Sequence, residues 1–482
     1  MKRLLLWAAA AFLLAVPVRG AGTEPRTFDW GFIASRQVDV NGDLRLKLLG
    51  PFFESAVSTN GLLFWAFRPV YGSVRDPADQ HAVKDILWPV AYDLQFRNEH
   101  GWRFLLAFYK NFDVTVPEPR YRFWILPIYF QGRDKHGQSY VGVFPLGGQV
   151  NEILGRDEAT FFLFPLTMYS SINKVETRDV LWPIYSRTEG KGIYRFRVFP
   201  FYSRAIHRDL WEKRFILWPF WTWAHYHYPR SSGTGYIVFP LWGHFDLQDQ
   251  KAWLVFPPLF RFSWGQRMNY SYCPWPFFQM SSGEIEKLYF WPLWGRKTMP
   301  GLKTTFFLWP IFRTEKVDRG DAVARRFMAV PFVQTEVLTK RPEAKGEKGE
   351  VVSRYFKLWP LFRYQREGSA RHFRFLELWP LRHTAPVERC YAPLWTLYSH
   401  AAVGDSVGNE VLWGLYRSSR RGSEERSVSL FPLAEWSRDS RGEGRREWAV
   451  LKGLVGYRRE GTQRTLRVLY WPVHFGPKEK AP

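Results

Sequence analysis

Two histidines offer the best reactive chemistry in this sequence. His225 and His227 lie two positions apart, so on a β-strand both side chains would lie on one face, about 7 Å apart. Imidazoles at this spacing suit a metal ion, but a zinc site needs at least three protein ligands. The strand expected to pair with them, residues 237–239, offers no third ligand. We therefore predict no metal site and no cofactor.

The other reactive residue types also fail to form a catalytic arrangement. The chain has no P-loop, no His-Glu-x-x-His and no Gly-x-Ser-x-Gly motif. Its two cysteines are not a Cys-x-x-Cys pair, and we expect two buried thiols, Cys273 and Cys390. We predict that the protein is not an enzyme. Two carboxylate pairs fall in expected turns, where solvation is the usual role: Glu284 with Glu286 and Asp246 with Asp249.

The composition excludes several classes of protein. Of 482 residues, 18% are aromatic, which is too much apolar surface for a disordered chain. The 33 prolines recur too often for long helices or coiled coils. Lys and Arg number 68 against 45 Asp and Glu, which gives a net charge of +23. The elements that carry these residues must therefore be strands or short turns.

The N-terminus has the pattern of a secretory signal. Lys2 and Arg3 precede an apolar run, residues 4–16, and Val18 and Gly20 stand at the −3 and −1 positions of a cleavage site. The run is shorter than the about 20 residues that span a bilayer, which favours cleavage. We therefore predict an exported protein of the bacterial cell envelope, in the outer membrane or the periplasm.

One dipeptide dominates the sequence. Trp-Pro occurs nine times, against about two expected from the composition, and Phe-Pro adds six more. From Pro183 to Pro310 the copies recur about every 18 residues, which marks a repeat architecture of about twenty-two copies once weaker ones are counted. We predict that these repeat residues are structural: Trp88, Pro89, Trp182, Pro183, Trp218, Pro219, Trp275, Pro276, Trp291, Pro292, Trp309, Pro310, Trp359, Pro360, Trp379, Pro380, Trp471 and Pro472.

Each repeat has the composition of a β-strand. Its short β-branched and aromatic run is bounded by charged, Gly-containing clusters such as residues 187–192. A strand of about 10–13 residues centred on the aromatic–Pro step, plus a turn, fills the period. We predict an all-β fold: a long antiparallel meander of about 20 repeats with a period of about 16–21 residues, either barrel-like or a creased two-layer sheet.

A proline at the centre of a strand removes one ladder hydrogen bond, so we expect a bend or bulge at each aromatic–Pro step. The aromatic ring before each Pro would then pack over its neighbours. Both strand faces are apolar near this step, as Leu217 and Trp218 show. A soluble sheet with one wet face alternates instead, and soluble monomers rarely expose an apolar stripe of this extent. The pattern favours contact with lipid or with a partner.

The chain divides into four predicted segments: the signal peptide at residues 1–20, an N-terminal segment at 21–60, a continuous β-repeat domain at 61–476 and a polar tail at 477–482. Within the domain, residues 338–352 are predicted to be a charged surface loop, because the interval from Pro331 to Pro360 is about ten residues longer than the mean.

Basic residues concentrate at the expected strand ends and turns. They suit contact with membrane lipid or an anionic envelope polymer, or they keep the sheet edges soluble. Nucleic acid is not an expected partner, because export removes the chain from the cytoplasm. The residues are Arg195, Arg197, Arg204, Arg208, Arg325, Arg326, Arg420, Arg421, Arg458 and Arg459.

Together these features predict an exported envelope β-repeat protein, associated with the outer membrane and with a structural or transport role without catalysis. The alternative is a soluble periplasmic or surface scaffold that binds a partner or a glycan along its aromatic stripe. Recovery in the membrane or in the soluble fraction separates the two.

Overall fold

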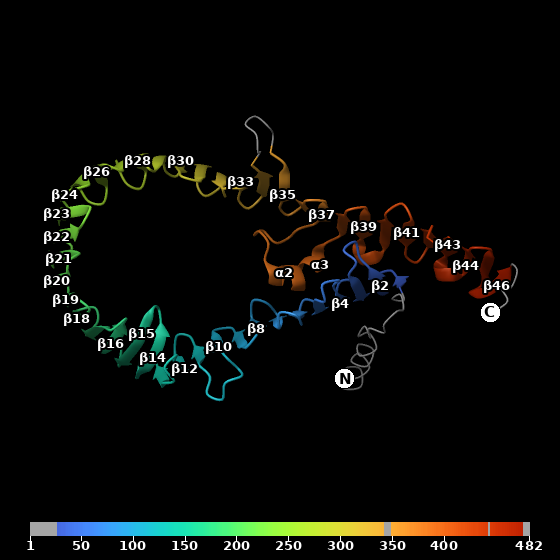
Figure 1. Cartoon of the computed structure of the whole chain (residues 1–482), viewed down its shortest axis with the longest axis horizontal. Helices are drawn as coiled ribbons and strands as arrows, with labels where there is room; N and C mark the ends of the chain where they lie inside the picture. The colour runs from blue at the N-terminus through green and yellow to red at the C-terminus, as the bar shows by residue number, and fades with distance from the viewer. Residues whose placement is uncertain (1–26, 342–348, 442–443, 476–482) are drawn as a thin grey trace. The chain divides into compact units, whose positions relative to one another are not determined.

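The computed structural model describes residues 27–341, 349–441 and 444–475 (Figure 1). The predicted signal peptide and polar tail lie outside these residues, as do residues 342–348 of the predicted charged loop. Of the rest of that loop, residues 338–340 end the strand Val333–Lys340 and residues 351–352 begin the strand Val351–Leu358. The described chain forms 46 strands of one antiparallel sheet, together with two short α-helices and two 3-10 turns. The predicted all-β antiparallel meander is confirmed.

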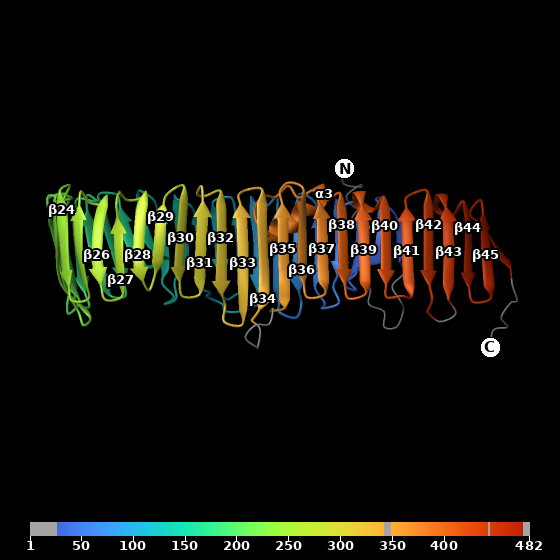
Figure 2. The same cartoon turned by 90° about the horizontal axis from the view of Figure 1, so that it is seen from above.

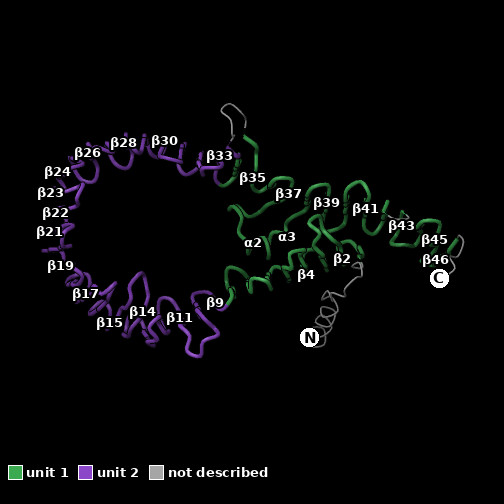
Figure 3. The backbone as a smooth tube through the Cα atoms, viewed as in Figure 1, with its two compact units in different colours: residues 1–97, 331–339, 349–482 green, residues 98–330, 340–348 purple. Residues whose placement is uncertain are grey.

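The chain divides into two compact units (Figure 3). Unit 1 comprises residues 1–97, 331–339 and 349–482, and unit 2 comprises residues 98–330 and 340–348. Unit 1 contains β1 (Phe28–Trp30), β2 (Ala34–Val38), β3 (Leu44–Leu48), β4 (Phe53–Val57), β5 (Leu63–Phe67), β6 (Tyr71–Asp76), β7 (His81–Ile86), β8 (Ala91–Phe96), β34 (Val333–Lys340), β35 (Val351–Leu358), β36 (Phe362–Glu367), β37 (Ala370–Phe375), α2 (Ala385–Cys390), α3 (Ala392–Trp395), β38 (Tyr398–Val403), β39 (Ser406–Val411), η1 (Leu412–Gly414), β40 (Tyr416–Arg421), β41 (Glu425–Leu430), β42 (Ala434–Asp439), β43 (Arg445–Val450), η2 (Leu451–Gly453), β44 (Val455–Glu460), β45 (Gln463–Val468) and β46 (Trp471–Phe475).

Unit 2 is a meander of the strands between these two groups. It contains β9 (Glu99–Phe104), β10 (Ala107–Asn111), β11 (Tyr121–Ile125), β12 (Tyr129–Arg133), β13 (Ser139–Val143), β14 (Gly147–Ile153), β15 (Arg156–Phe162), β16 (Thr167–Ile172), β17 (Val175–Val180), β18 (Tyr185–Gly190), β19 (Ile193–Val198), β20 (Tyr202–His207), β21 (Trp211–Ile216), β22 (Trp221–Tyr228), β23 (Ser231–Val238), β24 (Trp242–Leu247), β25 (Gln250–Val255), β26 (Phe260–Gly265), β27 (Met268–Tyr272), β28 (Phe278–Gly283), β29 (Glu286–Phe290), β30 (Trp294–Met299), β31 (Leu302–Phe307), β32 (Phe312–Asp318) and β33 (Ala322–Ala329).

Each repeat is a hairpin of two short strands, so the predicted position of the aromatic–Pro step at a strand centre is wrong. Trp309 and Pro310 lie in the turn between β31 and β32, where the bond between them is cis. The Ile311 N–H donates to the Leu308 carbonyl at 2.7 Å, which closes a four-residue turn with Pro at its third position. Proline has no N–H to donate to a strand ladder, and in this turn it does not need one.

The barrel-like alternative is also wrong. Among the described residues, β1 pairs only with β2, and β46 pairs only with β45, so the sheet is open at both ends. The physical reason lies in unit 1, where β1 packs against the face of the sheet that contains β40 and does not pair with an edge strand. Asp29 of β1, for example, forms an ion pair with Arg417 of β40 at 2.8 Å.

Unit 1 is two-layered, with β1–β8 in one layer and β35–β42 in the other. Turn residues of the two layers meet at the same end of the strands: Phe32 packs edge-on against Phe431 with ring centroids 5.5 Å apart. α2 and α3 fill the space between the layers, where Val387, Cys390 and Ala392 are buried. The two layers therefore share one interior.

Unit 2 has little apolar core of its own. The main buried cluster in its described part is Phe130, Tyr140, Val150 and Phe161, from β12 to β15. Further along, small residues such as Ser203, Ala205 and Ala252 are buried on one face. Small side chains let neighbouring backbones approach closely. Many of the large apolar side chains of this unit lie at the turns instead, where they are exposed.

Candidate functional site

The two ends of the strands differ sharply in chemistry. Because each repeat is a hairpin, the aromatic–Pro turns of a unit all fall at one edge of its sheet, and the Gly-rich charged turns fall at the other (Figure 2). We name these the aromatic–Pro edge and the polar edge. From residue 163 to residue 332 the first comprises ten turns: 163–166, 181–184, 199–201, 217–220, 239–241, 256–259, 273–277, 291–293, 308–311 and 330–332.

The turns of the aromatic–Pro edge are hydrogen-bonded to one another. Leu308 and Trp309 donate their N–H groups to Leu293 and Pro292, each at 2.7 Å. Aromatic rings follow the same path, since the Trp291 and Trp309 rings have centroids 5.9 Å apart. The predicted packing of each ring over its neighbours is thus observed, along a row of turns instead of a crease.

This edge is apolar and open to solvent. The ten turns named above contain no Asp, Glu, Lys or Arg. Trp182, Trp218 and Trp309 are 46%, 49% and 50% exposed, and the last turn residue of each motif is exposed as well. A folded protein rarely leaves a continuous apolar row uncovered. The edge is therefore the first candidate for a functional surface.

The apolar band is shallow. Counted from the edge, the second residue of several strands is charged, as at Asp179, Arg197 and Arg313. Apart from β1, the strands have five to eight residues, whereas a strand that crosses a bilayer needs about 9–11. The strands are therefore shorter than strands that cross a bilayer.

Seven of the nine predicted Trp-Pro pairs lie in these turns with cis bonds: Trp88-Pro89, Trp182-Pro183, Trp218-Pro219, Trp275-Pro276, Trp291-Pro292, Trp309-Pro310 and Trp359-Pro360. The other two differ. Trp379-Pro380 lies in the coil before α2, where the Trp379 indole donates to the Thr384 hydroxyl at 3.0 Å. Trp471-Pro472 begins β46.

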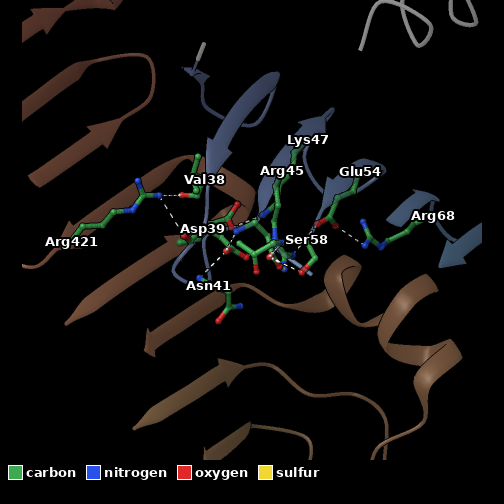
Figure 4. Close-up of polar contacts among 12 residues, drawn as sticks. Val38, Asp39, Asn41, Arg45, Lys47, Glu54, Ser58, Arg68 and Arg421 are labelled. Carbon is green, nitrogen blue, oxygen red and sulfur yellow. Dashed lines mark hydrogen bonds and ion pairs between the residues drawn. The ribbon is translucent and has the colours of Figure 1, made fainter. Parts of the chain in front are cut away.

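Buried ion pairs form the second candidate site, inside unit 1 (Figure 4). Glu54 on β4 accepts from Arg68 at 2.7 Å and from Arg45 at 3.1 Å. Burial by itself would raise the pKa of Glu54, but the charges of Arg68 and Arg45 outweigh it and lower that pKa to about 2. Both oxygens are occupied, so this carboxylate is a structural anion and not a proton donor at neutral pH.

Further ion pairs join the two layers. Lys47 on β3 bonds Glu410 on β39 at 2.6 Å, although the two residues are 363 positions apart in the sequence. Burial opposes ionisation of Glu410, yet the charges of Lys47 and Arg417 lower its pKa to about 2. The Arg421 guanidinium donates to the Val38 carbonyl at 2.6 Å (Figure 4). These contacts hold the layers together.

α2 is tied to both layers in the same way. Arg389 pairs with Asp85 of β7 at 2.6 Å, and its carbonyl accepts from Arg68 at 2.7 Å. Glu388 bridges Arg363 and Arg374; burial would raise its pKa, but these two cations lower it to about 2. Nothing local in the sequence marks this network, because partners such as Lys47 and Glu410 lie far apart in the chain.

The remaining candidates have ordinary roles. The His225 and His227 rings lie 4.1 Å apart on β22, and no group of three potential metal ligands occurs among the described residues. Asp249 accepts from the Ser231 hydroxyl at 2.6 Å and Asp246 pairs with Lys251 at 3.2 Å.

The two cysteines differ from each other. Cys390 is buried as expected, and burial raises its pKa to about 11, so it is a thiol at neutral pH. Cys273 is exposed, which corrects the expectation of two buried thiols. The reason is its position in an aromatic–Pro turn, where its bond to Pro274 is cis.

No described helix is both long enough and apolar enough to cross a membrane. A comparison with protein-family models found no match for this chain, and a search of curated proteins found none either.

Proposed function

We propose that this protein is a non-catalytic scaffold of the cell envelope, which attaches to a membrane by its aromatic–Pro edge. The observation that carries the proposal is the row of ten turns between residues 163 and 332 without a single charged residue, with large apolar side chains exposed along it. Water is a poor solvent for such a row, and burial in lipid recovers about 25 cal/mol for each Å² of apolar surface.

The depth of the apolar band supports attachment to one leaflet. Amphipathic elements that lie in a membrane interface bury their apolar side about 5–10 Å deep. The turn and the first strand residue above it fill that depth, and charged residues such as Asp179 and Arg313 begin just beyond. The sheet would then stand on the membrane with its polar edge in water.

The predicted export signal supports an envelope location, and the outer membrane is the surface we favour. A repeated, rigid sheet without a reactive cluster in its described part suits a structural or transport role. The large number of similar turns provides many weak attachments, so that the sum is strong although each turn contributes little.

Vesicle flotation tests the proposal with the whole exported chain. Neutral phosphatidylcholine vesicles should carry the protein to the top of a density gradient, and brominated lipids should quench its tryptophan fluorescence. The triple variant Ile184→Glu, Phe220→Glu, Ile311→Glu places charges on three exposed turn positions and should bind at least ten-fold less.

The matched control places the same charges on the polar edge, as Asn173→Glu, Gln248→Glu and Gln266→Glu. It should bind neutral vesicles as the wild type does. The proposal is wrong if the wild type stays with the soluble fraction, or if the two triple variants bind equally well.

A second candidate function has one observation in its favour. A shallow hollow on unit 2 is lined by Trp253 and Trp264 with the amides of Gln248, Gln250 and Asn269. Exposed indoles beside amides suit a sugar ring, which fits a soluble glycan-binding scaffold. Soluble envelope glycans should then shift the tryptophan fluorescence of the wild type but not of Trp264→Ala.

A further inference from the structure

One face of unit 1 carries a row of arginines at a single level. The row runs across β35–β37 and β40–β45, and the members on neighbouring strands are direct cross-strand partners. On β38 and β39 the same level holds Ala402 and Val407. We name the set the arginine row: Arg354, Arg366, Arg371, Arg420, Arg426, Arg438, Arg446, Arg459 and Arg464.

The arginine row is not neutralised by the described part of the chain. None of its members forms an ion pair there, and only Arg366, Arg420 and Arg459 donate to nearby backbone carbonyls. All are exposed except Arg366, which is half-buried. Acidic partners exist on these strands, but they lie on the opposite face.

A row of like charges is costly for a sheet. Strands lie about 4.8 Å apart, so the six arginines of β40–β45 form an unbroken line about 24 Å long. Like charges directly opposite one another destabilise a strand pair. Such a line is stabilised by an external ligand with several negative charges at similar spacing. Guanidinium groups bind phosphate with two parallel hydrogen bonds.

Two further rows on the same face indicate where the ligand lies. Two residues closer to the aromatic–Pro edge, or about 7 Å, is a level in which six of eleven side chains are Phe, Tyr or Trp. The six are Phe356, Tyr364, Phe373, Trp436, Trp448 and Tyr457, and the other five are His400, Asn409, Ser418, Val428 and Leu466. Two residues closer still, at the edge itself, is an apolar level: Leu358, Phe362, Phe375, Tyr398, Val411, Tyr416, Leu430, Ala434, Val450, Val455, Val468 and Trp471.

The order of the three levels matches a lipid interface. Apolar side chains suit the acyl region, Trp and Tyr are enriched at the interface, and basic side chains bind anionic headgroups above it. The arginine row lies four strand residues, or about 13 Å, above the apolar level. This is the height of the headgroups when the edge is inserted by the depth proposed above.

We infer that the arginine row is a binding site for the phosphate groups of anionic lipid headgroups. The inference rests on the proposed attachment and requires that unit 1 attach by its own aromatic–Pro edge, whose turns lie beside the row and bring it to the headgroup level. It adds a preference for anionic membranes and an orientation of unit 1 on them. A soluble phosphate polymer has the same chemistry, and the test separates the two sources.

The experiment compares binding of the whole chain to neutral vesicles and to vesicles with phosphatidylglycerol. The wild type should bind the anionic vesicles more tightly, with an advantage that falls as salt is raised. The variant Arg426→Gln, Arg438→Gln, Arg446→Gln should lose about a hundred-fold in affinity for anionic vesicles, about five-fold for each arginine. Its binding to neutral vesicles should stay unchanged.

The control variant removes three arginines outside the row: Arg178→Gln, Arg187→Gln and Arg458→Gln. Each has a carboxylate partner on its own strand, and the change in net charge is the same. The control should keep most of the preference for anionic vesicles. Circular dichroism of both variants checks that the sheet is intact.

Three outcomes overturn the inference. Equal binding of the wild type to neutral and anionic vesicles removes the headgroup site but leaves the proposed attachment intact. An equal loss in both variants assigns the preference to net charge. If the row variant loses binding to soluble polyphosphate but not to anionic vesicles, the ligand is a soluble polymer. Failure of the wild type to bind neutral vesicles contradicts the proposed function itself.

Discussion

The two faces of β40–β45 use the same residue type in opposite ways. Arg445 and Arg446 are neighbours in the sequence, but they lie on opposite faces. Arg445 pairs with Glu447 at 2.5 Å, whereas Arg446 stands between Arg438 and Arg459 without a carboxylate partner among the described residues. The difference teaches that the net charge of +23 is not spread evenly. Strand parity decides which arginines hold the fold together and which remain available to a ligand.

The largest effect is expected from a buried ion pair on the inner side of unit 1. Glu54→Gln leaves Arg68 buried without its full charge partner, which should cost about 3–5 kcal/mol of local stability. Hydrogen exchange of the amides in β3–β5 should become faster, and the thermal midpoint should fall.

The matched control is Glu176→Gln, whose partner Arg178 is exposed. An exposed pair contributes about 0–1 kcal/mol, so exchange in this variant should hardly change. Equal exchange in the two variants would show that the buried network does not stabilise the layers.

Acid should destabilise unit 1, because it protonates the carboxylates of these buried ion pairs. The pKa values of Glu54, Glu388 and Glu410 are about 2 in the folded chain, below the ordinary value of 4.5. Their stabilisation is therefore complete above pH about 4.5 and is lost as the pH falls toward 2. Denaturant melts at pH 6, 4 and 3 should show falling stability. A Glu54→Gln chain should lose less over this window than the wild type.

A much smaller effect, of opposite sign, is expected from the arginine row. Arg446→Gln relieves repulsion from Arg438 and Arg459, so stability without ligand should rise by about 0.2–1 kcal/mol at low salt. High salt should remove this gain. Urea unfolding at two salt concentrations measures it. A loss as large as that from Arg417→Gln, which breaks an ion pair to Asp29 in the other layer and one to Glu410 on the neighbouring strand, would mean that the row is structural.

The smallest effect is expected from the solvent-accessible ion pairs on the face of β40–β45 opposite the arginine row. Arg458 and Glu460 are in contact at 2.5 Å on the same strand, and their side chains are 34% and 51% exposed. Replacing Arg458 by Gln should change the unfolding free energy by about 0–1 kcal/mol. A loss beyond that range would show that this part of that face is covered in solution.

The sequence predicted the fold class because the repeat period and the turn residues are local signals. It did not predict the hairpin within each repeat, because the run around Trp309-Pro310 has the composition of a strand, while the four-residue turn is visible only in its geometry. Cys273 is exposed for a related reason, because it lies in another turn of the aromatic–Pro edge.

The sites were harder to predict. Lys47 and Glu410 lie hundreds of residues apart, and nothing local marks them as a pair. The arginine row left a weak signal, since Arg420 and Arg426 flank one polar turn at matching distances, as Arg438 and Arg446 flank the next. Reading that signal requires the strand register, which a single sequence gives only once the turns are placed correctly.

The hydrogen bonds between successive turns also have an evolutionary consequence. In unit 2 each hairpin pairs with the two beside it, as the bonds from Leu308 to Leu293 and from Leu181 to Leu166 illustrate. Duplication or deletion of a whole hairpin of about 18 residues would lengthen or shorten the sheet while leaving the order of its edges and faces unchanged. Descendants of one ancestral gene could therefore differ greatly in length and still present the same surface.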